Sequence, residues 1–482
     1  MQFQSTRDSA LRVSSSEAIV RGLAPKSGLF VPESFPQADL EGWKSLSYPA
    51  LAEQVLKGFL TDYSADFLHS ATAATYGEAF GGKAGETVKV SDGVYALELW
   101  HGPTCAFKDY ALQLMPKLLV EAKKNLGRTE TTRILVATSG DTGKAALAGY
   151  ADLDGIEIEV FYPNAGTSEI QHLQMATQKG ENVQVYAVEG NFDDAQTGVK
   201  RVFADDTVAA ELEARHIRLS SANSINWGRL VPQIVYYFYA YFRLAEQGAV
   251  EWGKPVDFCV PTGNFGDILA GYYAKQMGLP VGKLICASNK NNVLTDFIKT
   301  GTYDARRTFY KTTSPSMDIL ISSNLERLLL HTSGSAEKVE GWMQELAATS
   351  KYTVDADTLA KIQTSFAAGY ADDAAGAAEI RARFERDGYL CDTHTAVAFH
   401  VAEANRSTAP MVVLSTASPF KFPRDVLAAL GETAPESDFA AMAALTAKTG
   451  AAAPASLREL DKLPVRFNTV IQPGEIRAAA LR

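Results

Sequence analysis

The sequence has little positive charge for its size, and this excludes one large class of function. Its 482 residues carry 46 lysines and arginines against 56 aspartates and glutamates, a formal net charge of −10 at pH 7. A protein that binds nucleic acid needs a basic face, and no run of lysine or arginine supplies one here. Hydrophobic residues make up 46% and charged residues 21%, the balance of a folded globular protein rather than a disordered one. We therefore expect no nucleic-acid partner.

Cysteine is scarce and long apolar runs are missing. Four cysteines without a CxxC pair exclude a disulfide framework. The most apolar stretch, residues 230–244, contains a proline and an arginine and is too short to span a bilayer. Residues 1–7 lack the apolar core of a signal peptide. The sequence thus predicts a soluble, cytoplasmic protein without a membrane partner, and at roughly 150 residues per domain its length predicts about three domains.

From about residue 130, short apolar runs alternate with helix-forming stretches. This alternation is typical of parallel sheets covered by helices on both faces. Ligands of such sheets bind beyond the carboxyl ends of the strands. The sequence therefore predicts an α/β fold with its site in the loops after strands. The runs that predict strands are residues 133–137, 156–161, 183–188, 256–260 and 411–414.

The composition also predicts how the chain is divided. Residues 1–95 are mostly helical in pattern and are interrupted by prolines, so we expect an N-terminal extension there. Residues 96–430 are expected to form a core of two α/β domains, the smaller at about 130–228. The Ala-rich residues 431–482 are expected to form a C-terminal helical tail that covers the surface.

Two glycine loops follow predicted strands. One is SGDTG at 139–143 and the other is GNFGD at 263–267. At such positions free backbone N–H groups and the helix dipole favour an anion. Neither loop matches GxxxxGK[ST] or GxGxxG, which excludes the common nucleotide fingerprints. A pair of phosphate sites and a pair of plain strand-to-helix turns are equally good interpretations of these loops alone.

Three further segments bear on chemistry. Lys108 follows a Gly-Pro turn and Phe107; if desolvated, its amine has a lowered pKa and is a Schiff-base nucleophile, and the alternative is a surface lysine. The segment NSINWGR at 223–229 has amides, a hydroxyl and an arginine that can clamp a phosphate, although Asn and Ser also cap helices. The seven histidines show no metal-ligand spacing, so we expect no metal.

Taken together and in this order, the motifs resemble threonine synthase, a family of pyridoxal phosphate (PLP) enzymes with the tryptophan-synthase β-like fold (fold type II). The resemblance runs along nearly the whole chain, and the long N-terminal region is similar to the branch of fungi and many bacteria. The motifs that carry it are STR at 5–7, GLAP at 22–25, GLFVP at 28–32, HGPT at 101–104, FKD at 107–109, TSGDTG at 138–143, NSINWGR at 223–229, GNFGD at 263–267 and TAV at 395–397.

The resemblance implies a fold, a reaction and roles for residues. The fold is two interleaved three-layer domains with mostly parallel sheets that close on PLP. The reaction converts O-phosphohomoserine and water to L-threonine and phosphate by γ-elimination and β-addition of water. Lys108 is implied as the Schiff-base lysine and proton shuttle. The other implied cofactor residues are Asp141 at the ring hydroxyl, Gly263, Asn264, Phe265, Gly266 and Asp267 at the phosphate, and Thr416 at the pyridine nitrogen; Thr142, Asn223, Ser224 and Arg229 are implied at the substrate phosphate.

The chain departs from the family pattern at three places. Ser418 stands where the family commonly has a histidine, Thr393 where it has a proline, and Lys26-Ser27 where it has Asp-Gly. None of these is a cofactor residue, so we expect activity to survive, with rate and specificity left open by Ser418. Two alternatives are a phospho-lyase of the same fold that releases 2-ketobutyrate and a catalytically silent PLP-binding paralogue. The sequence does not predict oligomeric state or effector control.

Overall fold

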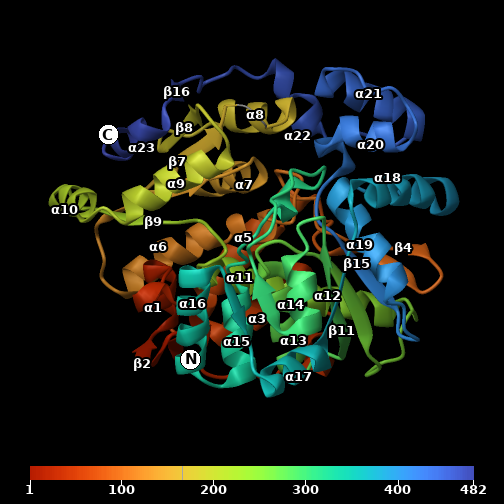
Figure 1. Cartoon of the computed structure of the whole chain (residues 1–482), viewed down its shortest axis with the longest axis horizontal. Coiled ribbons are helices and arrows are strands. Elements are labelled where there is room, and N and C mark those ends of the chain that lie inside the picture. The colour runs from red at the N-terminus through yellow and green to blue at the C-terminus, as the bar shows by residue number, and fades with distance from the viewer. Residues whose placement is uncertain (165–166) are drawn as a thin grey trace.

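The computed structural model describes residues 1–164 and 167–482, which are built around two sheets (Figure 1). The larger has six strands in the order β14-β11-β10-β15-β5-β4. All its neighbours are parallel except β4 and β5, which form an antiparallel edge. Its strands are β4 (Glu86–Ser91), β5 (Val94–Glu98), β10 (Val256–Pro261), β11 (Val281–Ser288), β14 (Phe366–Tyr370) and β15 (Met411–Ser415).

The smaller sheet has five strands, all parallel, in the order β16-β8-β7-β6-β9. Together with the larger sheet it confirms all five predicted strand runs. Both sheets are covered by helices, which is why strands such as β10 are buried along their whole length. The strands are β6 (Thr131–Ala137), β7 (Ile156–Pro163), β8 (Val183–Val188), β9 (Ile217–Ser220) and β16 (Val470–Ile471).

Helices fill the segments between the strands, as the α/β prediction requires. In Figure 1 the small sheet with α7, α8 and α9 lies above the large sheet with α13 and α14. The aromatic stripe at 236–242 lies on α12, where five of its six aromatic side chains are buried, so it is a core helix. The helices of this part are α5 (Asp109–Leu112), α6 (Met115–Asn125), α7 (Asp141–Tyr150), α8 (Glu169–Ala176), α9 (Phe192–Phe203), α10 (Asp206–Ala214), α11 (Trp227–Leu230), α12 (Ile234–Glu246), α13 (Gly266–Gln276), α14 (Val293–Thr300), α15 (Leu325–Ser333), α16 (Ala336–Thr349), α17 (Ala356–Ser365), α18 (Asp373–Ala382) and α19 (Thr393–Ala404).

The N-terminal region is less purely helical than its pattern predicts. Its helices are accompanied by a three-stranded antiparallel sheet that the sequence analysis missed, because two of its strands have three residues each and are too short to show a periodicity. The predicted boundary at residue 95 falls inside β5, so the large sheet includes residues that the composition assigns to the extension. The elements are β1 (Phe3–Ser5), β2 (Asp8–Val13), β3 (Phe30–Pro32), α1 (Ser15–Arg21), α2 (Leu40–Trp43), α3 (Tyr48–Phe59) and α4 (Ala65–Tyr76).

The C-terminal segment covers both sheets. It begins with the helices α20 (Pro423–Ala429), α21 (Asp438–Thr449) and α22 (Ala455–Arg458), and then crosses to the small sheet as β16 and α23 (Ile476–Ala480). Arg133 of β6 donates a hydrogen bond to the carbonyl oxygen of Ala480 over 2.7 Å, which fixes this end. The tail contains helices, and it also supplies an edge strand to the small sheet. A separate hairpin joins β12 (Thr302–Asp304) and β13 (Lys351–Thr353).

None of the helices in the described ranges is both long enough and apolar enough to cross a membrane.

Candidate active site

A cavity of about 800 Å³ lies where the loops after β6, β9, β10 and β15 meet. This is the position at which parallel sheets bind ligands. Leu23 and Ser27 bring the N-terminal region to the same cavity. Of the residues proposed from the sequence, only Asp141 is absent from the wall; those that line the cavity are Lys108, Thr142, Asn223, Ser224, Arg229, Gly263, Asn264, Phe265, Gly266, Asp267 and Thr416.

Lys108 lies at the start of α5 and is buried, so the surface-lysine alternative is wrong. Its Nζ donates a hydrogen bond to Oγ of Ser316 over 3.2 Å and lies 3.8 Å from a carboxylate oxygen of Asp141. Burial lowers the pKa of Lys108 to about 8; Asp141 works in the opposite direction, and the charge of Arg229 adds to the lowering. A lysine with this pKa has a substantial neutral fraction near neutrality, which a nucleophilic amine requires.

The loop at 263–267 joins β10 to α13. Phe265 has a left-handed backbone with φ of 64°, which turns the chain sharply into the helix that begins at Gly266. A Cβ atom on Gly263 would come within 2.7 Å of the carbonyl oxygen of Ser316, so only glycine fits there. The first N–H groups of a helix have no acceptor within the helix, so this loop presents donors and positive dipole to the cavity.

The side chain of Asp267 is turned away from this anion-binding loop. One of its carboxylate oxygens accepts hydrogen bonds from the hydroxyls of Tyr236, over 2.5 Å, and Tyr237, over 3.1 Å. Burial raises the pKa of Asp267 to about 7, although both hydroxyls oppose the rise. At this position the loop therefore has only its backbone to offer to an anion, because the carboxylate is held by two hydroxyls of α12.

The segment at 223–229 also lines the cavity, next to the start of α13: a Cβ atom on Gly266 would lie 3.5 Å from Cβ of Ser224. Arg229 is buried, donates to the carbonyl oxygen of Ala222 over 2.9 Å, and has its pKa lowered to about 10 by burial. Near neutral pH it is therefore a cation held in a dry site. Thr142, in the first turn of α7, lines the cavity beside it. Together these groups form a second place where a phosphate can be held by a guanidinium and by hydroxyl and amide donors.

Two residues that the sequence analysis missed hold this segment in place. Asn324 donates to Oγ of Ser224 over 3.0 Å and to the carbonyl oxygen of Asn264 over 3.1 Å, so it ties the two anion-binding segments together. Arg327, fully buried on α15, donates to the carbonyl oxygens of Ser224 over 3.2 Å and Ile225 over 2.6 Å. Both lie 60 or more residues from their partners, and no local motif marks them.

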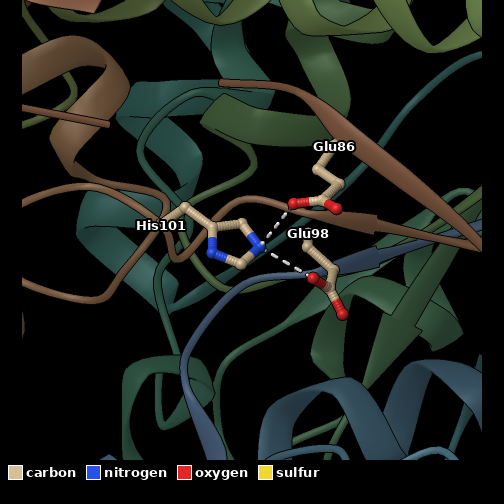
Figure 2. A group of neighbouring side chains, drawn as sticks. All are labelled: Glu86, Glu98 and His101. Atoms are coloured by element: carbon tan, nitrogen blue, oxygen red, sulfur yellow. Dashed lines mark hydrogen bonds and ion pairs between the residues drawn. The ribbon is translucent and has the colours of Figure 1, made fainter. Parts of the chain in front are cut away.

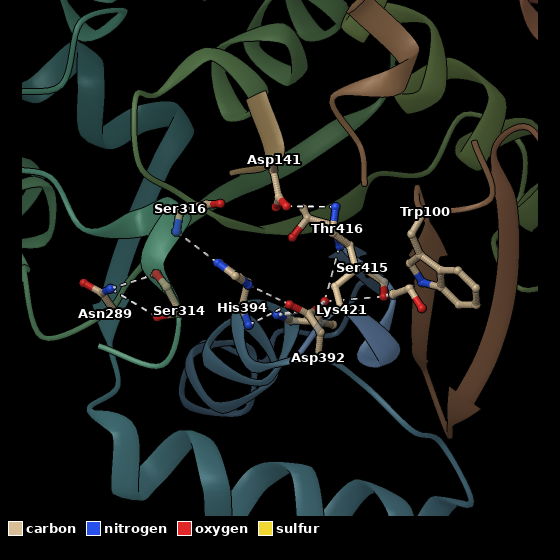
Figure 3. A network of polar contacts seen from close by, with 12 residues as sticks. Trp100, Asp141, Asn289, Ser314, Ser316, Asp392, His394, Ser415, Thr416 and Lys421 are labelled. Atoms are coloured by element: carbon tan, nitrogen blue, oxygen red, sulfur yellow. Dashed lines mark hydrogen bonds and ion pairs between the residues drawn. The ribbon is translucent and has the colours of Figure 1, made fainter. Parts of the chain in front are cut away.

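A carboxylate–imidazole pair, Asp392 and His394, contacts Ser316 (Figure 3). Nδ1 of His394 is 2.7 Å from Oδ2 of Asp392, and its Nε2 accepts a hydrogen bond from the backbone N–H of Ser316 over 3.1 Å. The ring therefore carries its proton on Nδ1. Ser316 belongs to a 3-10 turn at Pro315–Met317, and its hydroxyl contacts Lys108. His394 lines the cavity, and the sequence analysis assigned it no role.

The residues after β15 differ from one another in exposure to the cavity. Thr416 lines it, and its carbonyl oxygen accepts a hydrogen bond from the N–H of Phe107 over 2.8 Å. Ser418 is fully buried, does not line the cavity, and its hydroxyl accepts from the N–H of Phe420 over 3.3 Å. Ser418, where this chain departs from the family pattern, thus stabilises a turn behind the wall of the cavity.

One group of side chains in the described part of the chain has the residue types of a metal site (Figure 2). Nε2 of His101 lies 2.7 Å from a carboxylate oxygen of Glu98 and 3.4 Å from one of Glu86. The two glutamates are opposite each other on β4 and β5, so the imidazole lies between two like charges that would otherwise repel. The 2.7 Å distance is that of a hydrogen bond and is shorter than the roughly 3.4 Å between two ligands of one tetrahedral zinc ion. The absence of a metal stays a prediction.

Three family models match the chain. They are "Threonine synthase N terminus" at residues 2–76, "Pyridoxal-phosphate dependent enzyme" at 83–416 and "Threonine synthase, C-terminal" at 395–478. A threonine synthase of Pseudomonas aeruginosa is 40% identical over 88% of this chain and 90% of its own length. The human protein "Threonine synthase-like 1" is 42% identical over 86% of this chain, and the chain spans 58% of the length of that relative.

Solved structures are similar over the whole chain. The PLP-bound threonine synthase of Brucella melitensis has a TM-score of 0.90 and 38% identity, covering 100% of this chain and 99% of its own. Yeast threonine synthase has a TM-score of 0.88 and 34% identity, covering 99% and 97%. These similarities include both sheets and the N-terminal region.

Proposed function

Since the chain belongs to the threonine synthase family of PLP-dependent enzymes, we propose that it converts O-phosphohomoserine and water to L-threonine and inorganic phosphate. One observation supports the proposal: a single cavity is lined by a buried lysine and by two segments, 263–267 and 223–229, whose donor groups suit anions. In this proposal the loop at 263–267 binds the phosphate of the cofactor. The segment at 223–229 is then available to bind a second phosphate group, which a phosphorylated substrate would carry.

The residues of the cavity fit PLP. Lys108 offers a buried amine that reacts with its aldehyde, and the cradle at Gly263 and the start of α13 offer backbone donors to its phosphate. Thr416 offers a neutral hydroxyl to the ring nitrogen, which does not favour protonation of that nitrogen as a carboxylate would. When bound, PLP supplies the electron sink that stabilises negative charge at the carbons of the substrate.

The chain's own groups handle the protons. Nζ of Lys108 takes a proton in its neutral form and returns it in its charged form, and a pKa of about 8 suits both tasks near neutral pH. The hydroxyl of Ser316 holds Nζ at 3.2 Å. Because Ser316 is fixed by His394, the direction in which Lys108 points is set by the Asp392–His394 pair.

The second anion-binding segment acts on the leaving group. Arg229 is buried and charged, so it stabilises the phosphate most strongly as negative charge grows on it during elimination. Thr142, Asn223 and Ser224 supply donors around the same group. Asn324 and Arg327 hold the segment so that its donors are placed before the substrate arrives.

We further propose a small-molecule substrate as the partner, no nucleic-acid or membrane partner, and a cytoplasmic location. The net charge of −10 supports the absence of a nucleic-acid partner.

One assay tests the proposed reaction. Purified protein loaded with PLP is given O-phosphohomoserine, and phosphate, threonine and 2-ketobutyrate are measured together. Equal amounts of phosphate and threonine are expected. Phosphate with 2-ketobutyrate would identify a phospho-lyase instead, and visible cofactor absorbance without phosphate release would identify a silent binder. Lys108→Ala is expected to release no phosphate, whereas Lys117→Met, which removes a lysine of α6 outside the cavity wall, is expected to behave as the wild type.

A further inference from the structure

A second buried lysine lies behind the cavity. Lys421 is fully buried, and its Nζ lies 2.8 Å from Oδ1 of Asp141 and donates to the carbonyl oxygen of Thr104 over 2.9 Å (Figure 3). It does not line the cavity, and the reaction proposed above gives it no part. Burying an ammonium away from water costs free energy unless the charge is paired. The role of Lys421 therefore depends on the group that pairs with it.

That partner is shared with the catalytic lysine. Oδ1 of Asp141 faces Lys421, whereas Oδ2 lies 3.8 Å from Nζ of Lys108. Gln171 donates to Oδ1 over 3.1 Å, and the carboxylate is buried. One carboxylate therefore lies between two lysines, and the lysine outside the cavity is 1.0 Å closer to it than the lysine inside (3.8 − 2.8).

The charges of this group decide what Lys421 does. A lone carboxylate beside Lys108 would hold Nζ in its protonated form, which does not attack an aldehyde and takes no proton. With Lys421 at 2.8 Å, Asp141 already has a counter-charge, so Lys108 is free to lose its proton. The pKa of Asp141 agrees with this arrangement: burial alone would raise it, but Lys421 and then Lys108 outweigh burial and lower it.

We propose that Lys421 is a positioning residue for Lys108 and acts through Asp141, by neutralising the carboxylate that would otherwise keep Nζ of Lys108 protonated. This inference rests on the role of Lys108 given under the proposed function. It requires no particular substrate, since it concerns the nitrogen that holds the cofactor.

Other charged groups surround the two lysines and stay constant in the test. Arg229 faces Lys108 from α11 and lowers its pKa. Asp109 of α5 and Lys144 of α7 are the remaining charged groups that Lys421 influences, lowering the pKa of each. Because none of these is changed when Lys421 is replaced, a difference between the variants reports Lys421 alone.

The experiment is a pH titration of the visible absorbance of the PLP-loaded enzyme without substrate, which reports the protonation of the nitrogen that Lys108 supplies. The wild-type spectrum is expected to change with pH within the range in which the protein stays folded. In Lys421→Met the midpoint is expected to rise by about one unit, a tenfold change in the protonation equilibrium. Lys421→Gln, which keeps a hydrogen-bond donor, is expected to show the same rise if Lys421→Met does not fold, and Lys421→Arg is expected to keep the wild-type midpoint.

Two further variants decide whether Asp141 transmits the effect. In an Asp141→Asn background, Lys421→Met is expected to shift the midpoint no further. Lys144→Met removes a half-buried ammonium of α7, the helix of Asp141, that is bonded to Gln178, and it is expected to leave the midpoint unchanged.

Three results would overturn the proposal: a wild-type midpoint in both neutral Lys421 variants, an equal shift with and without Asp141, or a wild-type spectrum that is constant over the folded pH range. Lys108→Ala separates this failure from that of the proposed function. If Lys108→Ala still shows the wild-type visible spectrum, the assignment of the cofactor lysine is wrong and the inference falls with it. If that spectrum is lost and one of the three results above is found, only the inference fails.

Discussion

His394 accepts a hydrogen bond from the backbone N–H of Ser316 over 3.1 Å, and this contact connects the large sheet's helix α19 to the turn beside Lys108. The same turn presses its carbonyl oxygen towards Gly263, where only a hydrogen fits. One imidazole therefore supports the turn that contacts both Lys108 and Gly263.

Replacing His394 is expected to loosen that turn. In His394→Ala the N–H of Ser316 loses its acceptor and Lys108 loses a fixed partner, so we expect kcat for phosphate release to fall about 10- to 100-fold, as for other misplaced catalytic groups. Steady-state kinetics measure the change. His172→Ala removes an imidazole bonded to Tyr162, away from the cavity wall, and is the control expected to keep kcat. An unchanged kcat in His394→Ala would show that the turn does not need its acceptor.

Arg229 is expected to act on the substrate and not on the cofactor. Arg229→Ala removes the charge that we propose for the leaving phosphate, and we expect kcat/KM to fall by about 100-fold or more while the visible absorbance of bound PLP persists. Arg218 is exposed on β9, so Arg218→Ala is the matched control for the loss of one arginine. It should change neither kcat/KM nor the absorbance of bound PLP. Loss of the cofactor absorbance in Arg229→Ala would instead place this arginine at the cofactor phosphate.

A side chain at Gly263 is expected to disturb the cradle. The added Cβ of Gly263→Ala would lie 2.7 Å from the carbonyl oxygen of Ser316, and backbone cannot move aside cheaply. We expect a loss of about 1 to 3 kcal/mol in the free energy of unfolding, as for overpacked sites, and faster dissociation of PLP. Thermal unfolding and cofactor release measure the two effects. Gly341→Ala on α16 meets no atom within 4 Å and should be neutral or stabilising.

Asp267 is expected to make stability depend on pH. Its pKa is about 7 when folded and about 4 when unfolded, so between these values the folded state holds more protons. The free energy of unfolding of the wild type should therefore fall as pH rises from about 4 to about 7, relative to Asp267→Asn, by roughly 2 to 4 kcal/mol. Urea titrations of both proteins across this range measure the difference. A difference that is constant with pH would mean that the carboxylate is charged throughout.

The strands and their loops were predictable because each is a local unit. A short apolar run, a glycine loop and a helix follow one another within about 20 residues at 133–150 and again at 256–276, and the structure has both. Chemistry-bearing residues in these loops, such as Thr142 and Gly263, could therefore be placed at the sheet edge before their neighbours were known.

Residues that act across the chain could not be found in this way. Ser316 and His394 are 78 residues apart, and Asn324 is 100 residues from Ser224. Lys421 looks like any lysine in the sequence, and only the fold brings it to Asp141. The spacing of Asp392 and His394 is the one local signal, since a carboxylate two residues before a histidine at a helix start can fix its tautomer.

The small sheet cannot be completed until nearly the whole chain has been synthesised, because its edge strand β16 lies near the C-terminal end of the sequence. Its residues, 470 and 471, leave the ribosome 250 residues after β9 ends at residue 220, yet they complete the same sheet. At about 5 to 20 residues per second this delay is roughly 10 to 50 seconds. During that time β8 keeps an open edge while four strands of the large sheet, β10, β11, β14 and β15, are being translated. The edge of β8 can pair with β16 only after residues 470 and 471 are made. A chaperone or a neighbouring nascent chain can therefore bind this open edge first.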